Sequence, residues 1–92
     1  MSILHQFSTS LTADNAYQSA LPLVAYHDGM LFMGEALYGL LRCDFATPAA
    51  KVFLLAEDVQ ALGLSDQLKQ FTQIDYAQFV TLTLEYDKVI SW

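Results

Sequence analysis

The chain contains four short segments made mostly of apolar residues: 3–7 (ILHQF), 21–26 (LPLVAY), 51–56 (KVFLLA) and 71–74 (FTQI). Residues 21–26 and 51–56 form the more continuous apolar runs, which are typical of parallel strands covered by helices on both faces, and the other two are short, mostly apolar runs. We therefore predict a strand in each. The residues expected in the central, fully covered strands are Leu23, Val24, Val52, Phe53, Leu54 and Leu55.

The segments between these strands have helical features. Thr12 or Asp14 is placed to cap a brief helix that runs through Ala20 and is stopped by Pro22. Residues 30–42 (MLFMGEALYGLLR) are rich in Leu, Met and Ala and predict a longer helix.

The last third of the chain gives one clear helix and one ambiguous segment. Residues 57–62 predict a short helix, and Gly63 is suited to the left-handed position that follows a helix. In residues 75–86, apolar and polar side chains alternate as in a strand, but Asp75 and Gln78 have the spacing of a capping box. Helix is the preferred interpretation, because strands that alternate with helices form a parallel α/β sheet.

These elements predict one α/β domain over residues 1–92, with a mostly parallel sheet of four to five short strands flanked by helices. A chain of this length has no room for a second core. We found no internal repeat, low-complexity segment or linker.

Composition and charge narrow the classes of function. The chain is 54% hydrophobic and 15% charged, with a net charge of −6. Its four basic residues form no cluster that could neutralise phosphates, so we expect no direct binding of nucleic acid or anionic membranes. No apolar run approaches the ~20 residues of a membrane span. With a single cysteine and no basic flank of a signal peptide at the start, a cytoplasmic protein is expected.

The sequence His27-Asp28-Gly29 follows the second apolar segment. Parallel sheets bind ligands beyond the carboxyl ends of their strands, so Asp28 could orient His27 as a base there. Adjacent residues that leave a strand point in different directions, however, and no Gly-x-Ser-x-Gly motif supplies a nucleophile. The preferred interpretation is a strand-end turn in which Asp28 and Gly29 cap the next helix and Gly29 has a positive φ.

Other chemistries have weaker support. Gly29 and Gly34 are not part of a phosphate-binding loop, and His5, His27 and Cys43 lack the paired spacing of metal ligands. We therefore expect neither a metal nor a cofactor.

Cys43 is the only thiol and hence the remaining catalytic candidate. The preceding Arg42 would favour its thiolate, whereas a position near a helix C-terminus would disfavour it. An unreactive cysteine is the preferred interpretation.

The segment 30–42 also suggests an interface. Only Glu35 and Arg42 are charged within it, and they lie on one narrow strip. A helix that covers one face of a small sheet should have an apolar side toward the sheet and a wide polar side toward water. Here apolar residues surround most of the helix, so those that do not face the sheet are expected to contact another subunit. The chain should accordingly self-associate when expressed alone. The candidate interface residues are Leu31, Met33, Leu37 and Leu41.

The sequence resembles the DsrH/TusB family of small sulfur-relay proteins along nearly its whole length. The resemblance rests on SILH at the start, LAEDVQALGLSDQL in the middle, and IDYAQFVTLTLEYDKVISW at the end. It implies a DsrE-like α/β fold with a helix over residues 76–86.

The resemblance also implies a function and partners. Proteins of this kind assemble with TusC-like and TusD-like (DsrF/DsrE-like) subunits into a heterohexamer. That complex passes persulfide sulfur from thiolate to thiolate toward 2-thiouridine at the tRNA wobble position, or serves sulfur oxidation in the DsrEFH branch.

Two departures from the family affect the expected role. The DsrH branch carries a cysteine in its first helix, whereas residues 15–21 contain none, and this segment is shorter by about one helical turn. A non-catalytic subunit of the tRNA-thiolation relay is therefore the leading hypothesis. The alternatives are a sulfurtransferase that carries persulfide on Cys43 and a homo-oligomeric binding module that retains only the fold.

Overall fold

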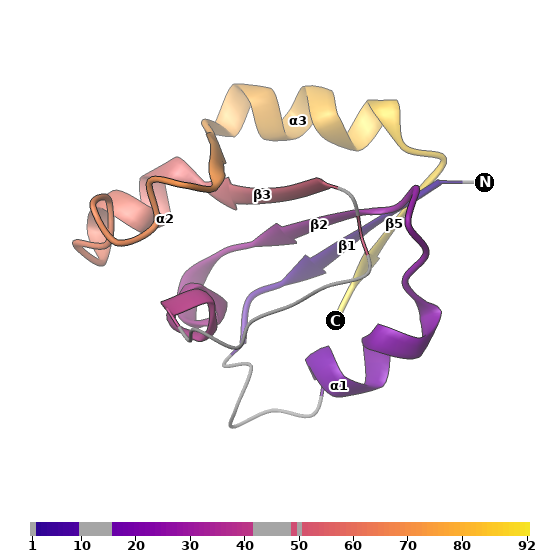
Figure 1. Cartoon of the computed structure of the whole chain (residues 1–92). Helices are drawn as coiled ribbons and strands as arrows, with labels where there is room; N and C mark the ends of the chain where they lie inside the picture. The colour runs from indigo at the N-terminus through magenta and orange to yellow at the C-terminus, as the bar shows by residue number, and fades with distance from the viewer. Residues whose placement is uncertain (1, 10–15, 42–48, 50) are drawn as a thin grey trace.

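The computed structural model describes residues 2–9, 16–41, 49 and 51–92. One five-stranded sheet forms its centre, in the order β4-β3-β2-β1-β5, and all neighbouring strands are parallel (Figure 1). This architecture confirms the predicted α/β class. The strands are β1 (Ile3–Phe7), β2 (Gly29–Phe32), β3 (Lys51–Leu55), β4 (Thr72–Ile74) and β5 (Lys88–Ser91).

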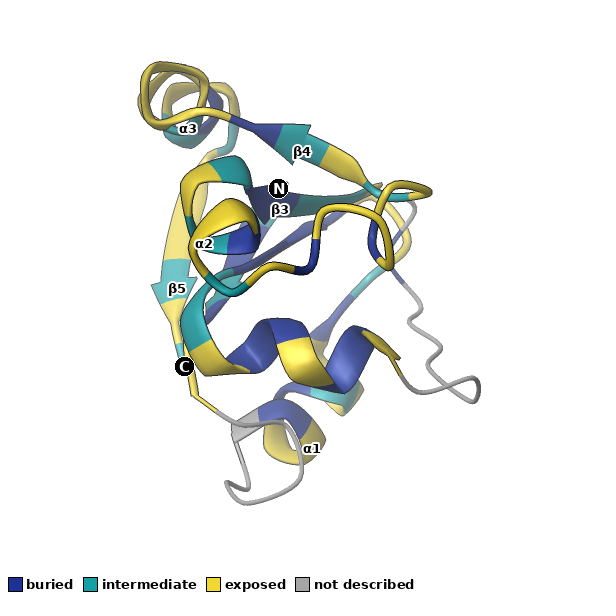
Figure 2. Ribbon diagram, turned by 90° about the vertical axis from the view of Figure 1, so that its left-hand side faces the viewer, coloured by how far each residue is buried: buried dark blue, intermediate teal, exposed yellow. Residues whose placement is uncertain are grey.

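Helices cover both faces of the sheet, with α3 on one side and α1 on the other (Figure 1). The α-helices are α1 (Ala16–Ala20), α2 (Ala56–Ala61) and α3 (Tyr76–Glu85), and the 3₁₀ helices are η1 (Leu21–Leu23) and η2 (Gly34–Leu41). In Figure 2 the buried residues lie on the strands and on the sides of the helices that face them.

The core consists of two clusters, one on each face of the sheet. The larger cluster joins Phe7, Phe32 and Leu54 of the strands to side chains of α1, η2 and α2. The smaller one joins Leu4 and Leu31 to Leu82 of α3, which is the only described helix that contributes to it. Among the described helices, several therefore cover one face and α3 alone covers the other.

Local sequence features explain both helices in the second half of the chain. The Gln78 amide donates to the Asp75 carboxylate (2.7 Å) and the Asp75 amide donates to the Gln78 side chain (2.8 Å), so the predicted capping box begins α3. Gly63, at φ 70°, follows the end of α2, as predicted.

Three predicted strands are confirmed with small shifts in their bounds. Residues 3–7 form β1, residues 51–55 form β3, and residues 72–74 form β4. Val52, Phe53, Leu54 and Leu55 lie in β3, which has neighbours on both sides. Strand β5 has no counterpart among the strands whose bounds were predicted.

The strand predicted over residues 21–26 is wrong. Leu23 lies in η1 and is 62% exposed, and Val24 is buried but follows this 3₁₀ helix outside any strand. Pro22, near the start of η1, lacks the backbone N–H that a sheet interior would require. The brief helix before it is present as α1, but its proposed caps, Thr12 and Asp14, lie outside the described residues.

The helix predicted over residues 30–42 is also wrong in its first part. Residues 29–32 form the central strand β2, and only residues 34–41 are helical, as the 3₁₀ helix η2. Asp28 therefore precedes a strand that begins at Gly29, and the two residues do not cap a helix. The positive φ expected at Gly29 occurs at Gly34 instead (56°).

Among the residues that the structure describes, no helix is long and apolar enough to cross a membrane.

Candidate functional site: the Asp28 network and the amino-edge pocket

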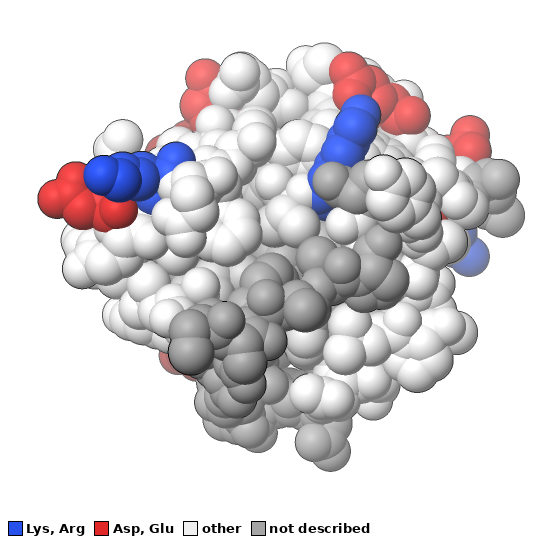
Figure 3. All heavy atoms as spheres, in the orientation of Figure 1, with Lys and Arg blue, Asp and Glu red and all other residues white. Residues whose placement is uncertain are grey.

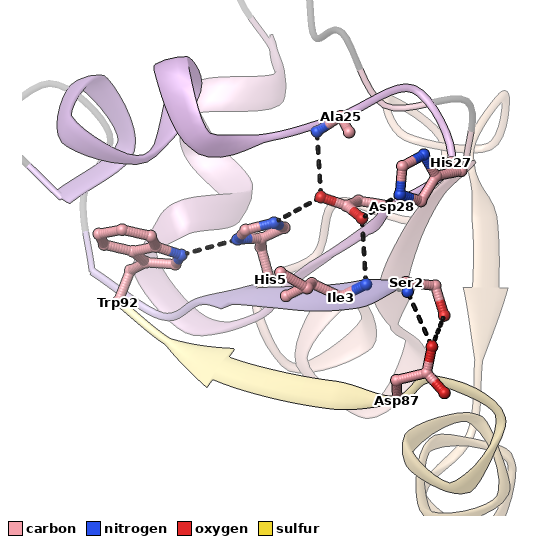
Figure 4. A network of polar contacts seen from close by, with 8 residues as sticks. All are labelled: Ser2, Ile3, His5, Ala25, His27, Asp28, Asp87 and Trp92. Carbon is pink, nitrogen blue, oxygen red and sulfur yellow. Dashed lines mark hydrogen bonds and ion pairs between the residues drawn. The ribbon is translucent and has the colours of Figure 1, made fainter.

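Asp28 lies at the amino edge of the sheet, where it joins β1 to the turn before β2. Its side chain is 2% exposed. One carboxylate oxygen accepts a hydrogen bond from the Ile3 amide of β1 (3.0 Å). The other accepts a hydrogen bond from the Ala25 amide (3.0 Å) and lies 3.1 Å from Nε2 of His5 (Figure 4). The turn before β2 thus ends in a carboxylate that faces the protein interior.

His5 continues this network toward the end of the chain. It is fully buried in β1, and its Nδ1 lies 3.0 Å from Nε1 of Trp92. An indole N–H can only donate, so Nδ1 accepts and the imidazole proton is on Nε2, which donates to Asp28. The chain Trp92 to His5 to Asp28 satisfies every polar atom of the imidazole and connects β5, β1 and the turn before β2.

Asp28 is stabilised as a carboxylate. Burial alone would raise its pKa, but the hydrogen bonds from Ala25, His5 and Ile3 outweigh burial and hold the pKa below its ordinary value of 3.8. With its donors already bound, Asp28 is suited to holding the fold together rather than to accepting a proton from a substrate.

A pocket of about 440 Å³ opens beside this network at the amino edge. Its residues come from the position before β1, the turn before β2, β3, α3 and the position after α3: Ser2, Tyr26, His27, Asp28, Lys51, Phe53, Leu82, Glu85 and Tyr86. Lys51 and Glu85 bring opposite charges to its wall, and Tyr86 brings a hydroxyl whose pKa is raised by burial and by the nearby carboxylates of Glu85 and Asp28.

Close packing favours glycine at position 29, the first residue of β2. A Cβ at this position would overlap the Tyr86 hydroxyl and would lie 3.3 Å from Cδ1 of Leu4. The glycine therefore allows α3 to approach the start of β2.

The structure brings His27 and Asp28 together and gives the candidate interface residues different surroundings. His27 is 62% exposed, and its Nε2 is 3.6 Å from Oδ1 of Asp28, on the pocket side of the carboxylate. Leu31 and Leu37 are fully buried within the chain, Met33 is partly buried, and Leu41 is exposed. Cys43 lies outside the described residues. Within those residues, His, Asp and Glu side chains form no group of three that could hold a metal ion.

Sequence reasoning missed His5 and Trp92 as members of one network. They are 87 positions apart, and no local pattern joins them. A histidine inside an apolar strand was the available indication, because a buried imidazole needs partners for both of its nitrogens.

The fold and the comparisons together define the class of protein. The solution NMR structure of protein Tm0979 from Thermotoga maritima superposes with a TM-score of 0.68, at 20% identity, over 92% of this chain and 93% of that one. This likeness places the chain among small α/β proteins with this fold.

The sequence comparisons identify the family. The family model "DsrH like protein" matches residues 9–89. Protein TusB of Photorhabdus laumondii is 32% identical over 81 residues, covering 76% of this chain and 80% of that protein. Protein TusB of Buchnera aphidicola is 32% identical over 71 residues, covering 75% and 72%. The chain belongs to the DsrH family, and the resemblance to DsrH/TusB proteins is confirmed.

Proposed function

We propose that this chain is a non-catalytic subunit of a sulfur-relay complex in the cytoplasm. Its partners are TusC-like and TusD-like proteins, and the complex passes persulfide sulfur toward 2-thiouridine at the tRNA wobble position. The observation that carries the proposal is membership of the DsrH family together with a first helical segment, residues 15–21, that contains no cysteine.

The Asp28 network supports a structural role for this polar centre. A relay subunit that carries sulfur needs an accessible thiolate. Asp28, His5 and Trp92 have no thiol, and their hydrogen bonds join the turn before β2 to β1 and to the residue after β5. The net charge of −6 supports a division of labour in which another component holds the tRNA.

The proposal is tested by reconstitution with the TusC-like and TusD-like proteins of the same genome. Transfer of labelled sulfur from a persulfide donor to the thiolates of the TusC-like and TusD-like subunits is measured for the complete complex, for the complex without this chain, and with Cys43→Ser. We expect omission of the chain to impair transfer and Cys43→Ser to leave it unchanged within the error of the assay.

Two results would contradict the proposal. If the chain does not co-purify with these partners, it is not a subunit of their complex. If Cys43→Ser abolishes transfer while the complex remains assembled, Cys43 carries the persulfide and the chain is a sulfurtransferase. Mass spectrometry of the chain after exposure to the donor identifies that persulfide directly.

A further inference from the structure

The pocket at the amino edge of the sheet contains polar side chains that the fold itself does not bind. In the part of the chain that the structure describes, the charged groups of Lys51 and Glu85 and the hydroxyl of Tyr86 make no hydrogen bond or ion pair. The neighbouring Asp28 differs from them, because three hydrogen bonds already occupy its carboxylate. Three polar groups of the pocket are therefore available to a ligand.

Tyr86 is the least exposed of these three residues. Its hydroxyl occupies the space that a side chain at Gly29 would need. Among the described residues, no buried side-chain N or O atom lacks a hydrogen-bond partner, so this unpaired hydroxyl is open to water at the pocket. Burial and the carboxylates of Glu85 and Asp28 raise its pKa, which keeps it protonated at neutral pH. It can therefore donate a hydrogen bond to a ligand.

The two free charges of the pocket have opposite signs and come from different elements. Lys51 is the first residue of β3, and Glu85 is the last residue of α3. No ion pair between described residues joins them, so a ligand can lie between the two charges. The carboxyl end of α3 adds a partial negative charge beside Glu85. Phe53, on the same face of β3 as Lys51, and Leu82 of α3 supply apolar contacts.

We propose that this pocket binds a free α-amino acid with a large apolar side chain. The ligand carboxylate accepts hydrogen bonds from Lys51 and Tyr86, and its ammonium group donates to Glu85. The apolar side chain contacts Phe53 and Leu82. The pocket volume of about 440 Å³ lies within the usual range for small-molecule sites. The inference goes beyond the sulfur-relay proposal and does not depend on it.

The pairing of charges selects a zwitterion over a ligand with one charge. A simple carboxylic acid would place its anion near Glu85 and Asp28 with nothing to offset the repulsion. A simple amine would leave Lys51 beside a second cation. An amino acid carries both signs on neighbouring atoms, so each free group of the pocket meets its opposite.

Both signs of charge occur at this part of the surface. In Figure 3, basic (blue) and acidic (red) atoms lie in the upper right of the view, where Figure 1 places the start of β3 and the carboxyl end of α3. Lys51 and Glu85 are exposed, so water weakens the ion pairs that they form. The ligand efficiency typical of small molecules then predicts a Kd of about 1–5 mM for L-phenylalanine.

The first test compares three ligands that share one ring. The full chain, labelled with ¹⁵N, is titrated with L-phenylalanine, with 3-phenylpropionate, which lacks the ammonium group, and with 2-phenylethylamine, which lacks the carboxylate. We expect L-phenylalanine to give saturable NMR shifts at the amides of Gly29, Lys51 and Tyr86. The other two ligands should bind about two- to fivefold more weakly, because each loses one ion pair.

The second test assigns each charge of the ligand to its partner. Glu85→Gln should weaken L-phenylalanine and 2-phenylethylamine but not 3-phenylpropionate. Lys51→Met should weaken L-phenylalanine and 3-phenylpropionate but not 2-phenylethylamine, and Tyr86→Phe should follow Lys51→Met. The matched controls are Glu35→Gln and Lys88→Met, which remove the same charges at exposed positions outside the pocket and should leave all three affinities unchanged. Circular dichroism checks that every variant is folded.

Three results would overturn the inference. One is the absence of saturable shifts with L-phenylalanine up to about 20 mM, well above the expected Kd. Another is equal affinity for all three ligands, which would mean that the ring alone binds to the surface. The third is a folded set of pocket variants that bind L-phenylalanine as the wild-type chain does, since the site would then lie elsewhere.

Discussion

The substitution Asp28→Asn tests the buried network most directly, because it changes one atom and leaves the shape intact. The carboxylate accepts from Ile3, Ala25 and His5 through two oxygens. The asparagine side chain has only one oxygen, so its NH₂ group would point at one or more of these buried N–H donors. Two donors cannot form a hydrogen bond with each other. His5 could turn its lone pair toward that NH₂ only by moving its proton to Nδ1, where it would oppose the Trp92 N–H.

The magnitude follows from the groups left unpaired. One buried donor without a partner costs about 1–3 kcal/mol, and the loss of charge-assisted hydrogen bonds adds to this, so we expect about 2–4 kcal/mol. With a urea slope of about 1 kcal/mol per M for a chain this small, the unfolding midpoint should fall by about 2 M or more. Unfolding can be followed by circular dichroism and by the fluorescence of Trp92, the only tryptophan.

The control is Asp87→Asn. Asp87 also accepts a backbone amide, that of Ser2 (2.9 Å), but it is exposed, so water can replace the lost interaction and the change should cost under about 1 kcal/mol. Equal, small effects of the two substitutions would refute the assignment of Asp28 as a buried structural acceptor.

The pH dependence provides an independent check. The pKa of Asp28 in the folded chain is lowered, because the hydrogen bonds to its carboxylate outweigh the effect of burial. A lowered carboxyl pKa stabilises the fold above its ordinary value of 3.8, and this contribution is lost as pH falls through the folded-state pKa. Wild-type stability should therefore fall more steeply below pH 3.8 than that of Asp28→Asn.

Further substitutions test the packing around the sheet and the environment of Tyr86. Leu54→Ala, in β3, should lower the free energy of unfolding in urea by about 2–5 kcal/mol. Leu23→Ala should change it by under about 0.5 kcal/mol, and the reverse order would contradict the assigned strands. Gly29→Ala should cost about 1–3 kcal/mol because its methyl overlaps Tyr86, and Tyr86→Ala should reduce that cost in a double-mutant cycle. In alkaline absorbance titration the pKa of Tyr86 should lie above the ordinary 10.0, because burial and the carboxylates of Glu85 and Asp28 disfavour its phenolate. Tyr86→Phe should remove the tyrosine ionisation that occurs at this higher pH. Stability should correspondingly be full below pH 10.0 and fall as pH rises through the raised pKa.

Local signals were enough to predict β3, α2, β4 and α3, but not β5. The capping box of Asp75 and Gln78 and the glycine after α2 act within one helical turn, so their effects can be recognised in sequence. Residues 51–55 are apolar on both faces and have neighbours on both sides, which is the environment that their composition predicts.

Residues 21–33 could not be predicted in this way because tertiary contacts decide their conformation. The four residues of β2 include Met and Leu, which suit helices, and none that is β-branched. They are nevertheless extended because β1 and β3 supply hydrogen-bonding partners on both sides. Residues 21–26 are also mainly apolar, but they contain Pro22. A proline is evidence against a central strand, because it cannot donate a backbone hydrogen bond to the sheet.

The adjacency of β1 and β5 has a consequence for how the chain folds. Ile3 pairs with Lys88 across 85 positions, so the outer edge of β1 has to wait for almost the whole chain to be synthesised before it is covered. Pairings of such long sequence separation close late because the loop entropy must be overcome first. Quenching or shift of Trp92 fluorescence as it reaches His5 would therefore report the last step of folding rather than the first collapse.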